Sequence, residues 1–301
     1  MQFDYIIIGA GSAGCVLANR LTNNIKNKVA LFEAGQPSDI WKVKMPLALL
    51  YTMHDPKYNW KYYSEPEPHL NNRRLFCPRG KMIGGSSAHN GMVFVRGNKN
   101  DYERWKSFGL KSWSYDKILP YFKKIENWSE GKNQYRGSLG LLPVNQSKNN
   151  NPLFKAFLGA VAEAGHKINP DINGEYQEGF GMFDTTIHNG ERASVSKHYL
   201  NPIIKRENLN IFSNSFVEKI IFEGKKAIGI EVKIKNRIEK IYVEKELILS
   251  GGSINSPQLL MLSGVGDANH LKEKGINVVH DLKGVGKNLQ DHLETYIQQE
   301  C

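Results

Sequence analysis

Three observations predict the fold class from the sequence: an α/β unit at the start of the chain, within a fold that is α+β overall. Residues 3–8 form a run that is apolar except for Asp4 and that glycine ends, as buried parallel strands do. Residues 12–21 then carry apolar side chains at helical spacing, and residues 29–32 form a second apolar strand. From residue 209 onwards, extended segments alternate with short polar turns, which is typical of an antiparallel meander. The chain is therefore expected to combine a right-handed parallel strand–helix–strand unit with antiparallel sheet.

The turn between the first strand and the helix has the pattern G-x-G-x-x-G. Gly9 makes the tight turn, Gly11 lets the backbone approach a pyrophosphate, and Gly14 allows close helix–strand packing. The helix N-terminus adds free N–H groups and a partial positive charge that favour phosphates. Glu33 ends the second strand 24 residues after Gly9, where a carboxylate can accept hydrogen bonds from ribose hydroxyls. The alternative is a glycine-rich surface turn with an incidental acid, but strand, helix and acid together favour a dinucleotide site.

Further elements are expected in the second half of the chain. A helix covers residues 152–165, with Gly165 as its stop. The strands of the meander, and one strand after it, are expected at residues 216–222, 227–235, 238–243 and 246–249. A last helix is capped by Ser256, begins at Pro257 and ends at Gly264.

The composition is that of an ordinary globular chain, with 40% apolar and 23% charged residues. A net charge of +10 admits an anionic partner, but the lysines are scattered between acids, without a basic stripe or an aromatic platform. We therefore expect no nucleic-acid partner, and at most peripheral association with the inner membrane. Cys15, Cys77 and Cys301 have neither metal-ligand spacing nor a disulfide pattern, which favours a reducing cytoplasm.

Several segments resemble one enzyme family. Residues 80–90 (GKMIGGSSAHN) resemble the first signature of the glucose–methanol–choline oxidoreductases, and residues 252–266 resemble the second. Further family-like stretches are Arg192-Ala193-Ser194, Tyr199-Leu200-Asn201-Pro202 and residues 285–292. Within the family, the choline-oxidising branch is the most similar, through residues 65–74 and 291–301.

The resemblance implies a two-domain flavoprotein. A Rossmann-type FAD-binding domain with the β-meander is expected at residues 1–150 and 205–290. An incomplete antiparallel-sheet substrate domain is expected at residues 151–204 and 291–301, where residues 293–301 alternate as a strand does. In this family, the flavin of FAD takes a hydride from an alcohol carbon. The resemblance therefore implies oxidation of a small primary alcohol, most closely choline, to betaine aldehyde.

The resemblance also implies which residues hold FAD. The ADP half would lie against Gly9, Gly11, Ser12, Ala13, Gly14, Glu33 and Ala34, with Val217 at the adenine. The pyrophosphate and flavin would lie along Gly85, Ser86, His89, Asn90, Gly91 and Val93. Small residues let main-chain N–H groups reach a cofactor, while an asparagine offers both a donor and an acceptor. At the position of His89, choline oxidases carry the flavin covalently on a histidine; the alternative is a histidine that stacks on the flavin or hydrogen-bonds to it.

The aromatic stretch around Trp60 admits two interpretations. Trp60 is a candidate for a cation–π contact with a quaternary ammonium substrate, and ordinary aromatic packing over the cofactor is the alternative. Ser194 and Lys197 have the S-x-x-K spacing of serine acylases without the companion motifs. Histidine and aspartate occur together only as adjacent pairs, so no metal site is expected.

No catalytic residue is assigned from the sequence. The family uses a histidine with a second histidine or an asparagine from a C-terminal segment, and none of the nine histidines here has a matching context. We therefore expect an incomplete chain that is inactive alone. The alternatives are a family member that acts on another alcohol, or a non-catalytic FAD-binding half of a split enzyme. The electron acceptor stays open.

Overall fold

The structure is a computed structural model that describes residues 1–292 and 294–300. The chain forms two compact units. The first contains Met1–Ala10, Arg20–Ala34 and Glu207–Cys301, and the second contains Gly11–Asn19 and Gly35–Arg206. These units are defined by how the chain packs. The boundaries expected from the sequence separate an FAD-binding domain from a substrate domain, and they stay a prediction.

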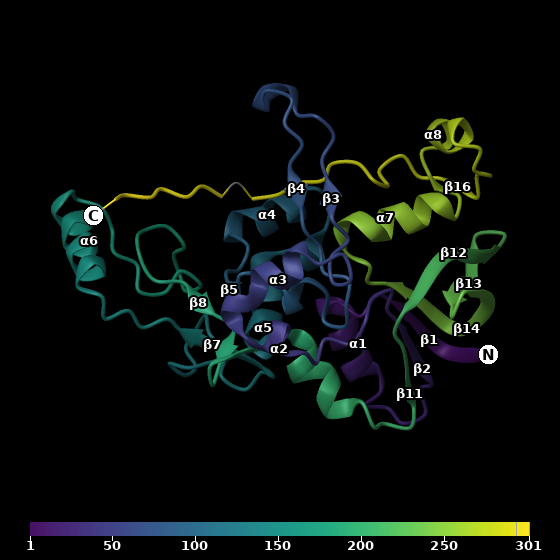
Figure 1. Ribbon diagram of the computed structural model, residues 1–301, viewed down its shortest axis with the longest axis horizontal. Coiled ribbons are helices and arrows are strands. Elements are labelled where there is room, and N and C mark those ends of the chain that lie inside the picture. The colour runs from purple at the N-terminus through teal and green to yellow at the C-terminus, as the bar shows by residue number, and fades with distance from the viewer. Residues whose placement is uncertain (293, 301) are drawn as a thin grey trace. The chain divides into compact units, whose positions relative to one another are not determined.

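The first unit is built on a six-stranded mixed sheet in the order β11-β2-β1-β14-β13-β12 (Figure 1). The strands are β1 (Gln2–Ile8), β2 (Val29–Phe32), β11 (Leu209–Phe212), β12 (Ser215–Glu223), β13 (Lys226–Ile234) and β14 (Arg237–Leu249). The pairs β11–β2, β2–β1 and β1–β14 are parallel, and β14–β13 and β13–β12 are antiparallel. The expected parallel unit and meander are therefore parts of one sheet.

Strand β14 joins these two parts. Residues 237–242 pair antiparallel with β13, and residues 242–249 pair parallel with β1. The sequence interpretation placed two separate strands at 238–243 and 246–249, and this was wrong. A single strand can take an antiparallel partner on one edge and a parallel partner on the other, so the polar residues between the two apolar runs do not break it.

Apolar side chains from both parts of the sheet form a common core. The buried cluster consists of Phe3, Ile6, Ile8, Ala30, Phe32, Val217, Ile220, Ile230, Val232, Ile241 and Leu259. Phe32 also stacks on Phe212 with ring centroids 4.7 Å apart. Burial of this size is the main stabilising term of such a unit, at about 1.5–3 kcal/mol for each large apolar side chain.

The helix that follows the sheet, α7 (Gly252–Leu262), begins earlier than the sequence indicates. The expected start was Pro257, but Pro257 lies inside the helix. Gly252 adopts φ +85° and turns the chain directly from strand into helix, and the proline then removes one helical hydrogen bond. The expected stop is confirmed, since Gly264 adopts φ +92°. The first unit also contains β15 (Val265–Gly266), α8 (Ala268–Glu273) and β16 (His280–Asp281).

A strand was expected at residues 293–301. The structure assigns no strand to residues 294–300, and residues 293 and 301 lie outside the described part of the chain.

The second unit combines short helices with a four-stranded sheet in the order β5-β8-β7-β6. Its α-helices are α1 (Ser12–Leu21, which runs into the first unit), α2 (Trp41–Lys44), α3 (Leu49–His54), α4 (Lys99–Ser107), α5 (Tyr115–Ile125) and α6 (Pro152–Glu163). Its strands are β3 (Tyr62–Tyr63), β4 (Phe76–Cys77), β5 (Val93–Phe94), β6 (Glu126–Trp128), β7 (Leu142–Gln146), β8 (Asp184–Thr185), β9 (Ile187–His188) and β10 (Glu191–Arg192). The sheet is antiparallel except for the parallel pair β6–β7. Helix α6 confirms the helix expected from residue 152.

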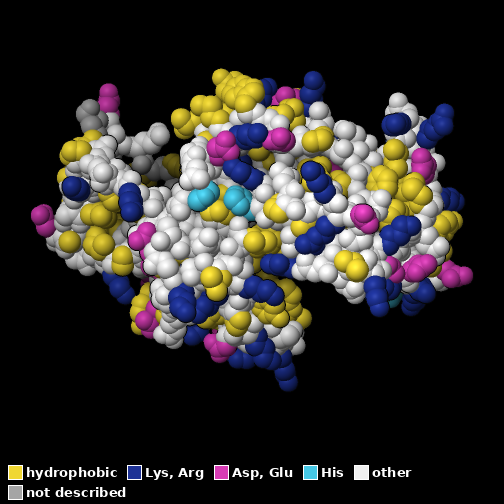
Figure 2. Space-filling model, turned by 90° about the horizontal axis from the view of Figure 1, so that it is seen from below, with side chains coloured by type: hydrophobic (Ala, Val, Ile, Leu, Met, Phe, Trp, Pro, Cys, Tyr) yellow, Lys and Arg dark blue, Asp and Glu magenta, His cyan; other side chains and the backbone are white. Residues whose placement is uncertain are grey.

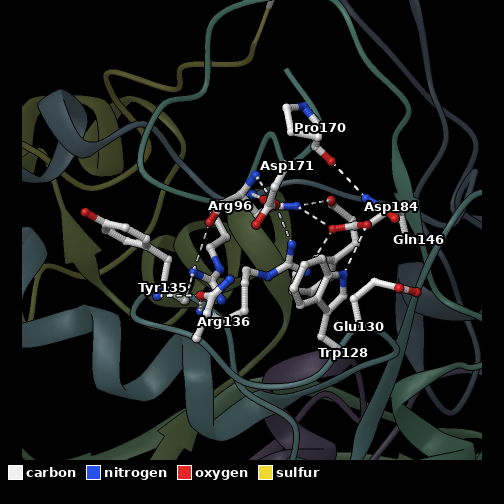
Figure 3. A network of polar contacts seen from close by, with 12 residues as sticks. Arg96, Trp128, Glu130, Tyr135, Arg136, Gln146, Pro170, Asp171 and Asp184 are labelled. Atoms are coloured by element: carbon white, nitrogen blue, oxygen red, sulfur yellow. Dashed lines mark hydrogen bonds and ion pairs between the residues drawn. The ribbon is translucent and has the colours of Figure 1, made fainter. Parts of the chain in front are cut away.

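A buried ionic cluster crosses this unit, and we call it the Glu126 network (Figure 3). Arg96 Nη2 lies 2.6 Å from Glu126 Oε1, and Arg136 Nε donates to both carboxylate oxygens of Glu126 at 3.2 and 3.3 Å. Arg136 also contacts Asp171 at 2.6 Å and Asp184 at 2.8 Å. The side chains of Arg136 and Glu126 are 0% exposed, so these charges interact in a medium that screens them weakly.

Aromatic and backbone groups complete the Glu126 network. Figure 3 shows Arg136 beside the ring of Trp128. The guanidinium lies 4.0 Å from the ring centroid, which is within cation–π range. The backbone N–H of Gly137 donates to Glu126 Oε1 at 2.6 Å, and Asn173 Nδ2 donates to Asp184 Oδ2 at 3.1 Å. Each buried carboxylate therefore has several donors.

Candidate functional site

The first glycine turn connects β1 to α1, and its entry is tightly packed. Gly9 adopts φ +99°, and its N–H donates to Phe32 O at 2.8 Å. A Cβ at Gly9 would lie 2.5 Å from the carbonyl oxygen of Ser250, the residue that follows β14. Only glycine fits this position, as the motif predicts.

Glu33 has a role in this turn that the sequence did not indicate. Its side chain is buried, and Oε2 accepts a hydrogen bond from the backbone N–H of Ala10 at 2.9 Å. The backbone of Glu33 is held by Phe212 and Ser215 at 2.8 Å each. The carboxylate therefore supports the glycine turn; the contact with ribose stays a prediction. Ala34 follows at a half-buried position, beside this fixed carboxylate.

Val217 lies on β12 and is buried in the core of the first unit. Its side chain packs into the sheet, and its predicted contact with adenine is one of the backbone. The packing and the predicted contact are compatible, because the side chain makes the first and the backbone would make the second.

Helix α1 begins at Ser12, at the end of the glycine turn. Ser12 and Ala13 are exposed, whereas Gly14 is buried. The first N–H groups of a helix have no partner within it, and the helix dipole adds a partial positive charge there. The start of α1 is therefore able to hold an anionic group such as a pyrophosphate.

The second glycine loop, residues 84–91, lies against Gly11. Gly85 adopts φ +54°, and a Cβ on it would lie 2.7 Å from Gly11 Cα. Gly84 adopts φ +94° and packs on Ser196, whose Oγ would lie 2.6 Å from a Cβ at Gly84. Ser86 Oγ accepts from the N–H of Gly80 at 3.1 Å, which closes the loop. Two motifs about 70 residues apart in sequence thus meet at glycines.

His89 is buried at the end of this loop, 3% exposed. Its backbone N–H donates to Ser86 O, and its Nδ1 has no hydrogen-bond partner within the described residues. Burial, and then the positive charges of Arg192 and Arg79, lower the pKa of His89 to about 4. The imidazole is therefore neutral at neutral pH, with one nitrogen left for a ligand atom.

Asn90, Gly91 and Val93 form the open part of the loop. All three are exposed, and a Cβ at Gly91 would meet nothing within 4 Å. Arg192 Nη1 donates to the backbone oxygen of Asn90 at 2.7 Å and to its Oδ1 at 2.9 Å. The sequence indicated Arg192 only as part of a family-like stretch, without a role.

The second unit carries groups that fit the pyrophosphate and flavin parts of FAD. The exposed first turn of α1 suits a pyrophosphate, and the loop from Gly85 to Val93 offers backbone, amide and imidazole groups beside it. The buried, unpartnered Nδ1 of His89 is the kind of atom that a bound cofactor satisfies. The residues present therefore fit the cofactor that the motifs predict.

Trp60 is half-buried and lies in a different setting. Its ring stacks on Tyr62 with centroids 6.0 Å apart, and Lys81 Nζ lies 5.0 Å from the ring centroid. The ring already takes part in a cation–π contact with this protein's own lysine. The role of Trp60 in substrate binding stays a prediction. Elsewhere, Ser194 bonds Ser196, and Lys197 pairs with Glu191.

Comparison with known proteins identifies the family. Residues 3–294 match the GMC oxidoreductase family. It is 48% identical over 308 residues to the mitochondrial choline dehydrogenase of Mus musculus, across 100% of this chain and 52% of that protein. It is 48% identical over 301 residues to the oxygen-dependent choline dehydrogenase of Brucella suis biovar 1, across 100% of this chain and 55% of that protein. The chain spans about half the length of these relatives.

Solved structures share the fold. Pyridoxine 4-oxidase from Mesorbium loti superposes with a TM-score of 0.92 at 31% identity, over 96% of this chain and 57% of that one. A formate oxidase variant from Aspergillus oryzae RIB40 gives a TM-score of 0.89 at 27% identity, over 97% of this chain and 52% of that one. The fold and the two glycine loops define an FAD-dependent oxidoreductase class. The chain belongs to the GMC oxidoreductase family.

Proposed function

We propose that the protein, at its full length, oxidises choline to betaine aldehyde with FAD as the hydride acceptor. Identity of 48% to two choline dehydrogenases across the whole chain supports this substrate. The observation that carries the cofactor assignment is the close approach of Gly85 to Gly11, which brings the first family signature (residues 80–90) against the G-x-G-x-x-G turn. When bound, FAD supplies the acceptor for the hydride that leaves the alcohol carbon.

The residues of the chain bind and orient the cofactor in this proposal. The N–H groups at Ser12 and Ala13 hold phosphate oxygens, and Glu33 keeps the turn before them in place through Ala10. Asn90 supplies a hydrogen bond from the second loop. His89 lies beside the flavin as a neutral imidazole, either linked to it or in contact with it. No residue of the chain is assigned to accept the hydroxyl proton.

The proposal is tested with purified full-length protein. We expect flavin absorption bands, and dye reduction that depends on choline and yields betaine aldehyde by mass spectrometry. Primary aliphatic and aryl alcohols are the matched substrates. Faster reaction with one of them would assign the enzyme to another alcohol, and bound flavin without any alcohol-dependent reduction would leave only an FAD-binding function. The same preparation precipitated with acid separates the two interpretations of His89, because linked flavin stays with the protein.

A pair of glycine variants tests the cofactor site separately from the substrate. Gly85→Ala places a methyl group against Gly11 and strains a positive-φ backbone, so we expect FAD affinity to fall at least tenfold. Gly159→Ala, in α6, adds a methyl group that meets nothing within 4 Å, and FAD affinity should not change. Equal affinity in the two variants would contradict the proposed site.

The cellular location of the protein and its electron acceptor are part of the same proposal. We propose a cytoplasmic protein at the periphery of the inner membrane, which gives its electrons to oxygen or to a respiratory acceptor. No helix in the described residues is long and apolar enough to cross a bilayer. On the face in Figure 2, Lys and Arg side chains are interspersed with Asp and Glu instead of forming a stripe. Release from membranes by salt supports peripheral binding, and oxygen consumption identifies the acceptor.

A further inference from the structure

Arg192 is a buried arginine whose contacts all lie around the second glycine loop and helix α2. It is 2% exposed. Nε donates to Val43 O at 3.1 Å, and Nη1 donates to Asn90 O at 2.7 Å and to Asn90 Oδ1 at 2.9 Å, with Ser87 O at 3.5 Å. The guanidinium is therefore held by neutral oxygens, two of which belong to Asn90.

The charge of Arg192 is not neutralised by an acid. No carboxylate of the described residues pairs with it, and burial lowers its pKa to about 10. A buried cation without an anionic partner is costly, and a protein retains one mainly where its geometry is needed. Nη1 alone holds both Asn90 oxygens, while Nε is anchored on Val43 O. The planar guanidinium thus fixes Nη1 from a second point of attachment, which a flexible lysine ammonium lacks.

The contacts of Asn90 define which part of its amide is available. Its Oδ1 accepts from Arg192 Nη1 and from the N–H of Met92 at 3.2 Å. Two donors at this atom identify it as the oxygen, so the NH₂ group points to the other side. Within the described residues, that NH₂ group donates to no acceptor, and Asn90 is exposed. The side chain that the sequence predicted as both donor and acceptor is therefore available as a donor only.

We propose that Arg192 is a positioning residue that fixes the Asn90 amide as a hydrogen-bond donor to the bound FAD. The inference rests on the proposed FAD site and adds to it the identity and direction of one contact. Arg192 acts through Asn90, 102 residues earlier in the chain, and also holds the loop by the Asn90 backbone oxygen. The acceptor on FAD is an oxygen or an unprotonated nitrogen, because only such atoms accept from an amide NH₂.

The test measures FAD affinity of flavin-free full-length protein, by quenching of flavin fluorescence. Asn90→Asp keeps an oxygen for Arg192 and removes the NH₂ donor, so we expect FAD to bind about tenfold more weakly. The melting temperature should not fall, because the new carboxylate pairs with the buried Arg192 cation. Arg192→Met should weaken FAD binding to a similar extent, and Arg192→Lys should recover part of the loss, because its ammonium can donate to the Asn90 oxygens but has no second nitrogen to anchor on Val43 O. The flavin absorption band should broaden in Arg192→Met.

A double-mutant cycle decides whether Arg192 acts through Asn90. If it does, Asn90→Ala with Arg192→Met binds FAD no more weakly than Asn90→Ala alone. Additive losses, or wild-type affinity in Asn90→Asp, would overturn the proposal while leaving the FAD site intact. If the wild-type protein binds no FAD, the proposed function itself fails, so the two failures are distinguishable. Should Arg192→Met not fold, Asn90→Asp and Arg192→Lys still decide the question.

Discussion

The second unit buries arginine in two contrasting ways. In the Glu126 network, Arg96 and Arg136 meet three carboxylates, and both arginine side chains are nearly inaccessible to solvent. Arg192 is equally buried but meets only carbonyl and amide oxygens. The first arrangement pairs each guanidinium with at least one carboxylate, two cations against three anions, while the second leaves a positive charge without a carboxylate partner beside an open loop.

The difference separates a structural role from a functional one. Both arginines of the Glu126 network are paired with carboxylates inside the fold, so the removal of one of these charges should lower the stability of the folded state and leave FAD binding unchanged. Two of the contacts of Arg192 are made to Asn90, an exposed residue of the predicted cofactor loop, so the removal of Arg192 should affect FAD binding. Stability and FAD affinity are therefore the two measurements that test the comparison.

The largest expected effect is on stability, from Glu126→Gln. This change keeps the shape of the side chain but removes the negative charge that faces Arg96 and Arg136. Breaking one partner of a buried ion pair leaves an uncompensated charge and typically costs about 3–5 kcal/mol. We expect a loss of this size in the free energy of unfolding, measured by urea denaturation.

The matched control is Glu130→Gln, which makes the same change at an exposed glutamate nearby. Surface changes of this kind stay within about 0.5 kcal/mol. FAD affinity should be that of the wild type in both variants at temperatures where they are folded. A Glu126→Gln protein that is as stable as Glu130→Gln, or that loses FAD while folded, would show that the two arginine settings do not differ as described.

A smaller effect is expected on how the free energy of unfolding depends on pH, through His89 and His198. Burial and the charges of Arg192 and Arg79 lower the pKa of His89 to about 4, and burial lowers that of His198 to about 4 as well. Between this value and the ordinary 6.5, the unfolded chain binds more protons than the folded chain, so stability falls as pH falls. For His89 the expected loss between pH 7 and pH 5 is about 2 kcal/mol.

Urea unfolding of the flavin-free protein at both pH values measures this loss. His89→Gln should remove its share of the pH dependence, and His198→Gln should remove a separate share. If neither change alters the difference between pH 7 and pH 5, the two imidazoles are not kept neutral by the fold. The Glu126→Gln protein should retain the wild-type pH difference, because the network lies outside these contacts.

The sequence predicted the parts of the fold that local patterns determine. The first helix and second strand match at residues 12–21 and 29–32, because an apolar run, glycines and helical spacing are local signals. The start of α7 was wrong because proline is common in the first turn, whereas a positive-φ glycine allowed an earlier start. The continuity of β14 depends on having two different partner strands, which a single-strand pattern does not contain.

The site was predicted less completely than the fold. Motif spacing indicated the two glycine loops, but their contact at Gly11 and Gly85 is a product of the tertiary structure. The partners in the Glu126 network lie on separate segments between residues 96 and 184, and no periodic signal connects them. Arg192 stood in a family-like stretch, yet its partner is 102 residues away, so its role required the structure.

The smallest expected effect concerns a third way of holding a cation, on an aromatic face. Lys81 Nζ lies 5.0 Å from the Trp60 ring centroid. If this ring also binds the choline ammonium, Trp60→Ala raises the KM for choline about two- to fivefold, as exposed cation–π contacts are worth about 0.5–1 kcal/mol. Lys81→Met removes the competing cation and should lower the KM slightly. Steady-state kinetics of the full-length protein with choline, and with a neutral alcohol of similar size as the control, measures both. An unchanged KM in Trp60→Ala would remove Trp60 from the substrate site.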